Sequence, residues 1–224
     1  MTLPFKMKIE TDMEAYRAAT FWDKEPETIA WINTFENREV FFDIGANIGV
    51  YSLYAACRLP KSPVRAFEPH PGNFNRLVEN ILLNGFKNVS GVNVMLSDRY
   101  GKATFSYTDN EIGSSGGQAV PGGIDYTRAL DELIDFSFDF PQPDHIKIDV
   151  DGNEIAILKG AKNTLKYVKS VLVEVSERTK SEAVYMLTVA GMTPSKLNDM
   201  APHSRERRRK DGIDAENLIY VREI

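Results

Sequence analysis

The sequence predicts an α/β domain in which a mostly parallel sheet carries helices on both faces. Short apolar runs recur along the chain with helical segments between them, which is typical of such a sheet. The run Val40–Ile44 leads into a turn with two glycines and then into a helix over Val50–Leu59. The length of 224 residues suits one well-packed domain and is short for two.

Composition excludes several classes of protein. The formal net charge of −5 argues against general nucleic-acid binding. No uncharged run approaches the roughly 20 apolar residues of a membrane span, and the first residues lack the apolar core of a signal peptide. Cys57 is the single cysteine and cannot form an internal disulfide. We therefore expect a cytoplasmic protein without nucleic-acid or membrane partners, in which Cys57 packs in a helix.

Residues 1–39 are expected to form a helical lead-in packed on a domain that spans 40–224. Glu25-Pro26-Glu27 has the features of a helix start, with proline at an early position and acids in the first turn. The aromatic side chains of this region favour packing against the sheet, because apolar stripes at helical spacing usually belong to the core. Closing a pocket is the alternative role for Phe21, Trp22 and Trp31.

The turn Gly45-Ala46-Asn47-Ile48-Gly49 points to a ligand at the carboxyl edge of the sheet. A dinucleotide-binding turn would have glycine where Asn47 stands, and Asp43 before the turn would repel a diphosphate. A nucleoside carrying an amino acid fits better, because its ammonium can pair with a carboxylate and its carboxylate can face helix amides. We therefore predict S-adenosylmethionine, bound by Asp43, Gly45, Ala46, Asn47 and Gly49.

The second strand, Val64–Pro69, ends in an acid that suits a ribose. Glu68 follows Asp43 at about the spacing of the acid that binds ribose hydroxyls in nucleotide-binding units, and a carboxylate can accept both hydroxyls at once. We expect Glu68 and Pro69 at the cofactor, with a solvated loop glutamate as the alternative. A helix over 73–83 follows and ends at Asn84-Gly85.

The third strand is expected over Val89–Leu96, and Ser97 and Asp98 after it are candidates to contact the adenine amino group. The alternative is that Ser-Asp is ordinary turn chemistry. Residues 100–123 then contain a strand and two glycine-rich turns. We expect a β-hairpin and mobile loop inserted at the sheet's edge, either as a surface excursion or as part of an acceptor pocket. A short helix over Leu130–Phe136 follows.

The stretch His145–Glu154 predicts a strand that runs into a turn and a helix over 155–165. Asp149 and Asp151 should therefore lie at the same edge as the glycine turn, and His145 at the opposite end of the strand. The two acids could steer an acceptor, take its proton or hold a divalent cation. Helix capping explains Asn153 and Glu154, but it does not explain a carboxylate within a buried strand, which needs a partner.

The remaining elements are a fifth strand over Val171–Val175, a helix over Ser181–Ala190 and two last strands, Met192–Pro194 and Asn217–Glu223. We expect the final strand to be an antiparallel edge strand. The basic run 203–212 favours a solvated loop over recognition of an anionic acceptor.

Several motifs in this order resemble the FkbM family of S-adenosylmethionine-dependent methyltransferases. The resemblance runs from about Glu25 to Glu177, and it rests on Asp43–Gly49, Ala66–Pro69, Asn80–Gly85, Leu96–Asp98, Leu130–Leu133 and Ile146–Glu154. It implies a class I methyltransferase (Rossmann-like) fold with seven strands, one of them antiparallel. It also implies methylation of hydroxyl groups, often on sugars or secondary metabolites. One departure is Asp151, where the family commonly has glutamate.

The resulting hypothesis is O-methyl transfer from S-adenosylmethionine to a hydroxyl of a small molecule. Asp149 is the first candidate for the proton acceptor and Asp151 the second, with His70 and Glu174 as further candidates. No metal is required by the spacing, although Asp149, Asp151 and Glu174 would be the ligands of a cation. The Asn/Asp-Pro-Pro-aromatic turn of many N-methyltransferases is absent after the fourth strand. A nicotinamide-dependent dehydrogenase and a non-catalytic cofactor-binding module are the alternatives.

Overall fold

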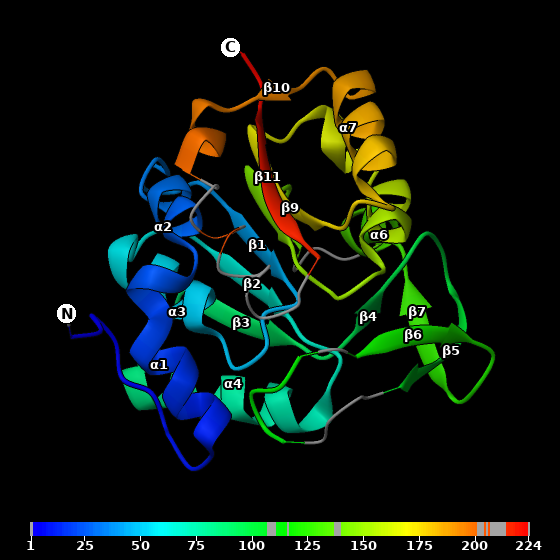
Figure 1. Ribbon diagram of the computed structural model, residues 1–224. Helices are drawn as coiled ribbons and strands as arrows, with labels where there is room; N and C mark the ends of the chain where they lie inside the picture. The colour runs from blue at the N-terminus through cyan, green and yellow to red at the C-terminus, as the bar shows by residue number, and fades with distance from the viewer. Residues whose placement is uncertain are drawn as a thin grey trace.

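The computed structural model describes residues 2–106, 111–115, 117–136, 140–200, 204, 206 and 214–223. Its main sheet has seven strands in the order β10-β11-β9-β8-β1-β2-β3 (Figure 1). In chain order these are β1 (Phe41–Ile44), β2 (Val64–Phe67), β3 (Val89–Val92), β8 (His145–Ile148), β9 (Ser170–Val175), β10 (Thr193–Pro194) and β11 (Glu216–Val221). β11 runs antiparallel to both β9 and β10 and the other strand pairs are parallel, so the predicted mostly parallel sheet is confirmed.

The last strand does not lie at the edge, which corrects one expectation. β11 lies between β9 and β10, and the two-residue β10 covers its outer side. Leu218, Ile219 and Tyr220 of β11 are all buried. A strand with side chains buried on both faces suits an interior position, whereas a short strand such as β10 is a common way to close an edge.

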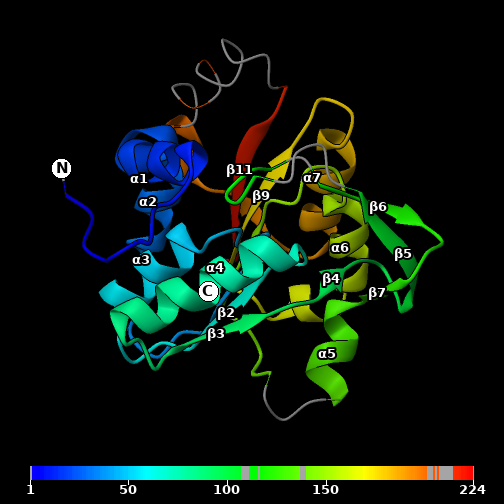
Figure 2. The same cartoon turned by 90° about the horizontal axis from the view of Figure 1, so that it is seen from below.

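Helices cover both faces of the main sheet (Figures 1 and 2). One hydrophobic cluster joins residues of the first four helices to the sheet face that carries Phe41, and a second joins the later helices to the face that carries Phe42. These neighbours in sequence are both fully buried because successive strand residues point to opposite faces. The helices are α1 (Asp12–Lys24), α2 (Pro26–Ile32), α3 (Val50–Arg58), α4 (Pro71–Asn84), α5 (Leu130–Phe136), α6 (Glu154–Gly160) and α7 (Lys180–Val189), with short 3-10 turns at Thr164–Lys166 and Lys196–Met200.

The predicted third strand is divided between two sheets. Only β3 joins the main sheet, because Asn93 turns the chain away and donates its side-chain amide to the carbonyls of Glu68 and Pro69. The next strand, β4 (Met95–Leu96), pairs with β7 (Asp125–Arg128) in a second sheet of order β4-β7-β5-β6. The predicted hairpin is formed by β5 (Gly101–Ser106) and β6 (Gln118–Pro121), and its residues 107–110 and 116 lie outside the described part.

The N-terminal segment is fastened along α4. Arg76 of α4 is only 3% exposed and forms ion pairs with Glu10, Glu14 and Glu79. Such a buried guanidinium is stable because carboxylates surround it. These contacts fasten the start of α1 to α4, and Thr11 caps α1 with a capping box that includes Glu14.

The packing predicted for the aromatic residues of this region holds for Phe21 and Trp31. Phe21 packs against Phe5 and Tyr54, and Trp31 packs against Phe35 and Phe41. The Trp31 indole also donates to the Ser170 hydroxyl at the start of β9. Both side chains therefore belong to the core that joins the N-terminal helices to the sheet.

Gly45 lies where the ends of β1 and β8 come closest. Its φ is +81°, and a Cβ atom built there would lie 1.9 Å from the Asp149 carbonyl oxygen. The Asp149 amide donates to Ile44, so β8 is fixed to β1 at this contact. Only glycine fits this position, because any side chain would separate the two strands.

We predict that Gly45→Ala lowers the free energy of unfolding by about 3 kcal/mol or more, since left-handed strain and a backbone clash act together. Urea denaturation measures the loss. Gly85→Ala is the matched control, because Gly85 also has a positive φ, of +65°, but nothing lies within 4 Å of a Cβ atom there. That control is expected to lose only about 1 kcal/mol. Equal losses in the two variants would contradict the close approach of β1 and β8.

Candidate functional site

Most of the predicted site residues gather at one edge of the main sheet. β1 lies between β2 and β8 and is parallel to both. The segments that follow the three strands therefore meet at their carboxyl ends, as in other open α/β sheets. These segments are Gly45–Gly49, Glu68–Pro69 and Asp149–Asp151.

The turn after β1 is held open by two left-handed residues besides Gly45. Asn47 has a φ of +53°, a conformation that asparagine tolerates better than most residues, and Gly49 has a φ of +94°. Gly49 precedes α3, whose first turn has no side-chain cap. The turn therefore directs the amide end of a nine-residue helix toward the edge of the sheet.

Glu68 is fixed in place by the backbone on both sides. One carboxylate oxygen accepts the Asn47 amide and the other accepts the His70 amide, each at 2.8 Å. The side chain is only 5% exposed, and burial raises the pKa of Glu68 to about 7 against the lowering effect of these two hydrogen bonds. Each oxygen keeps a further lone pair, so the carboxylate can still accept two hydroxyl groups.

A segment of the insertion lies against this turn. The Ser114 carbonyl accepts the side-chain amides of both Asn47 and Asn73. α1 holds the same segment from the other side, because Thr11 donates to Ile112 and Arg17 donates to Gly113. The sequence offered a surface excursion or an acceptor-pocket wall for the insertion, and residues 111–115 pack on the glycine turn.

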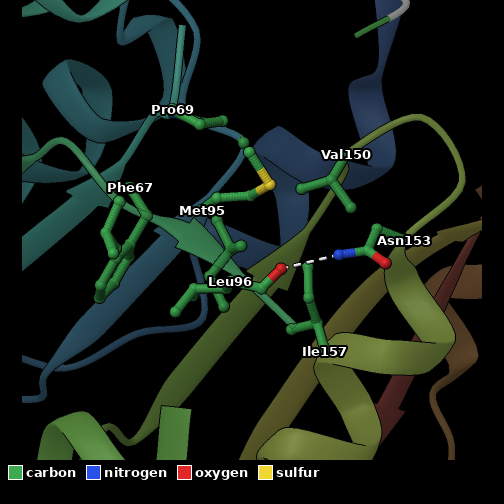
Figure 3. A pocket seen from close by; sticks show the side chains of 10 residues that line it. Phe67, Pro69, Met95, Leu96, Val150, Asn153 and Ile157 are labelled. Atoms are coloured by element: carbon green, nitrogen blue, oxygen red, sulfur yellow. Dashed lines mark hydrogen bonds between the residues drawn. The ribbon is translucent and has the colours of Figure 1, made fainter. Parts of the chain in front are cut away.

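A small apolar pocket opens beside the turn, between the ends of β1, β2, β4 and β8 (Figure 3). Pro69 lines it, whereas the predicted adenine contacts Ser97 and Asp98 lie beyond its lining. Asn153 fixes its lower wall by donating to the Leu96 carbonyl at 2.7 Å. The lining residues are Ile44, Gly45, Phe67, Pro69, Val94, Met95, Leu96, Val150, Asn153 and Ile157.

Asp43 lies beneath the edge rather than at it. Its side chain is 1% exposed, and one carboxylate oxygen accepts the Ser52 hydroxyl at 2.6 Å. The other oxygen lies 3.8 Å from the Lys147 ammonium. Burial raises the pKa of Asp43, although Lys147 and Ser52 act in the opposite direction. Asp43 therefore belongs to a buried polar group between β1, β8 and α3.

Asp149 lies at the edge itself. Its side chain is 24% exposed, and one of its oxygens accepts the Lys147 ammonium at 2.7 Å. Burial alone would raise the pKa of Asp149, but the adjacent Lys147 ammonium outweighs it and the pKa lies below its ordinary value. The predicted need of this carboxylate for a partner is met by a residue two positions earlier on β8.

The other predicted acids and histidines occupy different places. Asp151 lies in the turn after β8 with a φ of +57°, and Glu174 lies on β9 opposite Asn217. His70 caps α4 by accepting the Asn73 amide. His145 lies at the far end of β8, where its ring contacts Glu39 and Ser170. Of these, only Asp151 shares the edge segment with Asp149.

Sequence reasoning missed Lys147 and Glu25. Glu25 is 1% exposed, accepts the Tyr51 hydroxyl at 2.9 Å and pairs with Lys24 at 3.1 Å, while Lys147 lies 5.2 Å from the Tyr51 ring centroid. The signal for Lys147 was present, because a lysine inside the apolar strand Ile-Lys-Ile requires a buried anion. No comparable pattern marked Glu25, whose partner is on α3.

The described residues contain no group of three or more histidine, cysteine, aspartate or glutamate side chains placed to hold a metal ion. Their helices are all too short or too polar to cross a bilayer.

The residues present fit a nucleoside that carries an amino acid. The pocket offers an apolar surface suited to one face of a flat ring, and the buried Glu68 carboxylate, between the lining residues Phe67 and Pro69, has lone pairs suited to ribose hydroxyls. The amide end of α3 suits the carboxylate of the amino-acid part, and the Asp149 carboxylate lies at the same edge of the sheet. The geometry therefore agrees with the ligand predicted from the turn.

Solved structures share this fold. One is the precorrin-6y C5,15-methyltransferase of Geobacter metallireducens GS-15, at 15% identity over 98% of this chain and 94% of that chain, with a TM-score of 0.52. Another is the fibrillarin of Aeropyrum pernix with bound S-adenosyl-L-methionine, at 11% identity over 89% of this chain and 76% of that chain, with a TM-score of 0.52. At such identities the likeness concerns the fold, and it confirms the class I methyltransferase architecture.

Sequence relatives are more informative. The chain is 34% identical over 147 residues to the hexuronic acid methyltransferase AglP of Haloferax volcanii, which covers 62% of this chain and 57% of that protein. It is 28% identical over 169 residues to the methyltransferase sdnD of Sordaria araneosa, covering 60% of this chain and 65% of that protein. The chain thus spans less than two thirds of either relative.

The model of the methyltransferase FkbM domain matches residues 43–201, which include the glycine turn, Glu68 and the Asp149 edge. This match covers well over half of the chain. The chain therefore belongs to the FkbM family of methyltransferases, and its cofactor is S-adenosylmethionine.

Proposed function

We propose that this chain transfers the methyl group of S-adenosylmethionine to a hydroxyl of a sugar or a secondary-metabolite-type small molecule. The observation that carries the proposal is the partly exposed Asp149 carboxylate beside the glycine turn, with its charge maintained by Lys147. A methyl transfer to a hydroxyl requires a proton acceptor, and Asp149 is at the correct edge of the sheet for that role. The name of the Haloferax relative supports a sugar acceptor.

Each part of the cofactor has residues suited to it. The Glu68 carboxylate binds the ribose hydroxyls, and the apolar cavity lined by Pro69 and Met95 holds the adenine ring. The turn Gly45–Gly49 and the start of α3 hold the amino-acid end. When bound, the cofactor supplies a methyl group on a positively charged sulfur.

Asp149 takes the proton that the acceptor hydroxyl loses as its oxygen forms the bond to the methyl carbon. The cofactor would supply the methyl group and would keep the electron pair of the carbon–sulfur bond, so charge and atoms balance. Because the pKa of Asp149 is lowered, this carboxylate cannot ionise a hydroxyl in advance. It accepts the proton only while the new bond forms, when the oxygen becomes strongly acidic. Asp151 is the second candidate for this role.

Several finer assignments remain predictions. A cytoplasmic location rests on the single cysteine, and a division between a lead-in at 1–39 and a domain at 40–224 rests on the sequence pattern. The basic run 203–212 lies almost wholly outside the described residues, so the solvated loop favoured for it, with recognition of an anionic acceptor as the alternative, also stays a prediction. The family match rules against the dehydrogenase alternative. A non-catalytic module is the alternative that experiment must exclude.

We predict that Asp149→Asn lowers methyl transfer by about 10²-fold or more, because an amide cannot take the hydroxyl proton. Transfer is measured with methyl-labelled S-adenosylmethionine and the methyl glycosides of glucose, glucuronic acid and galacturonic acid. Asp135→Asn, an exposed carboxylate of α5, is the matched control and keeps the wild-type rate.

The chemistry of the product separates the outcomes. A methyl ether resists mild alkali, whereas a methyl ester formed on the uronic acid carboxylate is hydrolysed. Ester formation that survives Asp149→Asn would contradict hydroxyl transfer, because a carboxylate acceptor has no proton to lose. Absence of transfer by the wild-type protein to every acceptor would favour the non-catalytic module.

A second prediction concerns the pH dependence of cofactor binding. Glu68 has a folded-state pKa of about 7, above its ordinary value, so its protonated form accumulates below pH 7. That form has lost part of its accepting capacity for ribose hydroxyls. The Kd of S-adenosylhomocysteine is therefore expected to rise about tenfold between pH 8 and pH 6, since only the ionised form binds.

Isothermal titration calorimetry at a series of pH values measures the Kd of S-adenosylhomocysteine. Glu68→Gln is the control, because it cannot titrate; it should bind weakly at every pH with a much flatter dependence. A wild-type Kd that does not change between pH 6 and pH 8 would remove Glu68 from the ribose site.

A further inference from the structure

Lys147 has an unusual position for a lysine. It lies in the middle of β8 with its side chain 2% exposed, and it is among the largest fully buried side chains of the described residues. A buried ammonium is costly unless carboxylates surround it. The register of the sheet provides one such carboxylate, because Lys147 lies directly opposite Asp43 of β1.

The contacts of the ammonium are unequal. Its nitrogen lies 2.7 Å from an oxygen of Asp149 but 3.8 Å from the nearer oxygen of Asp43, which is beyond hydrogen-bond distance. That Asp43 oxygen accepts no hydrogen bond from the described residues, while the other Asp43 oxygen has Ser52 as its donor. The one direct hydrogen bond from Lys147 to a carboxylate, within the described part of the chain, therefore goes to the edge of the site.

We propose that Lys147 is a positioning residue for methyl transfer: it holds one oxygen of Asp149, so that the other oxygen is left for the reacting groups. This inference rests on the proposed function of Asp149. It distinguishes Lys147 from a lysine that only neutralises the buried Asp43. It also distinguishes Lys147 from a base, since an ammonium placed between two carboxylates keeps its proton.

Charged and titratable groups reach Asp149 from every element around it. Lys147 comes from β8 and Asp43 from β1, Tyr51 comes from α3, and Lys24 and Glu25 come from the junction of α1 and α2. Besides burial, the charge of Asp149 raises the pKa of Glu154 on α6. Among the residues that the structure describes, only Lys147 forms a hydrogen bond to the Asp149 carboxylate, so it has the largest influence on how that carboxylate is oriented.

Removing the ammonium shows whether Lys147 positions Asp149 or only neutralises the buried Asp43. In Lys147→Met, the side-chain length is kept but Asp43 and Asp149 lose their shared cation. The fold is expected to weaken because Asp43 becomes an uncompensated buried charge. The double variant Lys147→Met/Asp43→Asn removes that charge, and the amide that replaces the Asp43 carboxylate can still accept the Ser52 hydroxyl through its oxygen.

The experiment compares the wild-type protein, Asp43→Asn, Lys147→Met and the double variant. Urea denaturation reports the fold, and carbon-13 NMR of labelled aspartates, assigned with Asp149→Asn, reports the titration of Asp149. We expect the double variant to recover most of the urea midpoint lost in Lys147→Met. Its Asp149 should still titrate at least about one pH unit above the wild type. Where an acceptor is active, transfer should stay at least about tenfold low and the acid limb of its pH profile should move upward.

A double variant that recovers the wild-type titration of Asp149 together with the urea midpoint would overturn the proposal, because Lys147 would then serve only Asp43. A lowered rate with an unshifted titration in Lys147→Met would overturn it as well. The titration and the urea midpoint need no acceptor. Failure of the proposed function has a different signature, which is a wild-type protein that transfers no methyl group to any sugar tested.

Discussion

The in-register pairing of β1 with β8 is the interaction on which the rest of the site depends. It places Asp43 opposite Lys147 in a sheet that is covered on both faces, so neither charge reaches water. A buried charge without a partner costs several kcal/mol, and the two therefore constrain each other. Asp149 completes the group at the point where β8 leaves the sheet. The Lys147 ammonium thus lies between Asp43 in the core of the sheet and Asp149 at its carboxyl edge.

The close contact of Gly45 with Asp149 gives this pairing a second consequence. Because no side chain separates the strand ends, the glycine turn and the Asp149 carboxylate are held side by side by backbone contacts. Methyl transfer requires an in-line arrangement of reacting atoms, and holding such an arrangement supplies much of the acceleration. A site built on two paired strands is more rigid than one built on loops, which suits that requirement.

The N-terminal helices and the insertion take part in the same arrangement. α1 is fastened to α4 through Arg76 and contacts the segment 111–115, which in turn contacts Asn47. Glu25, between α1 and α2, reaches Tyr51 on α3. Segments far apart in the sequence therefore enclose the glycine turn. Removing the first residues would disturb the turn as well as the packing of the helices.

Local patterns were sufficient to place strands β1, β2, β8 and β9, the glycine turn, and Glu68 at the end of β2. Each of these depends on residues within a few positions of one another, such as an apolar run followed by Gly45 or by Glu68. The division of Val89–Leu96 between two sheets was not predictable in this way, since it depends on Asn93 reaching Glu68 and Pro69. The interior position of β11 likewise depends on pairing with the two-residue β10, which is too short to give a pattern of its own.

The sequence by itself determined the fold class, the carboxyl edge as the place of the site and the kind of cofactor, because strand, glycine turn and helix are encoded by neighbouring residues. The tertiary structure alone decided how the charges are distributed at that edge. In the folded chain Asp43 lies in the core, and Asp149 pairs with the Lys147 ammonium. Val94 and Met95, rather than Ser97 and Asp98, line the pocket. Partners of buried charges come from other strands and helices, and spacing along one chain does not specify them.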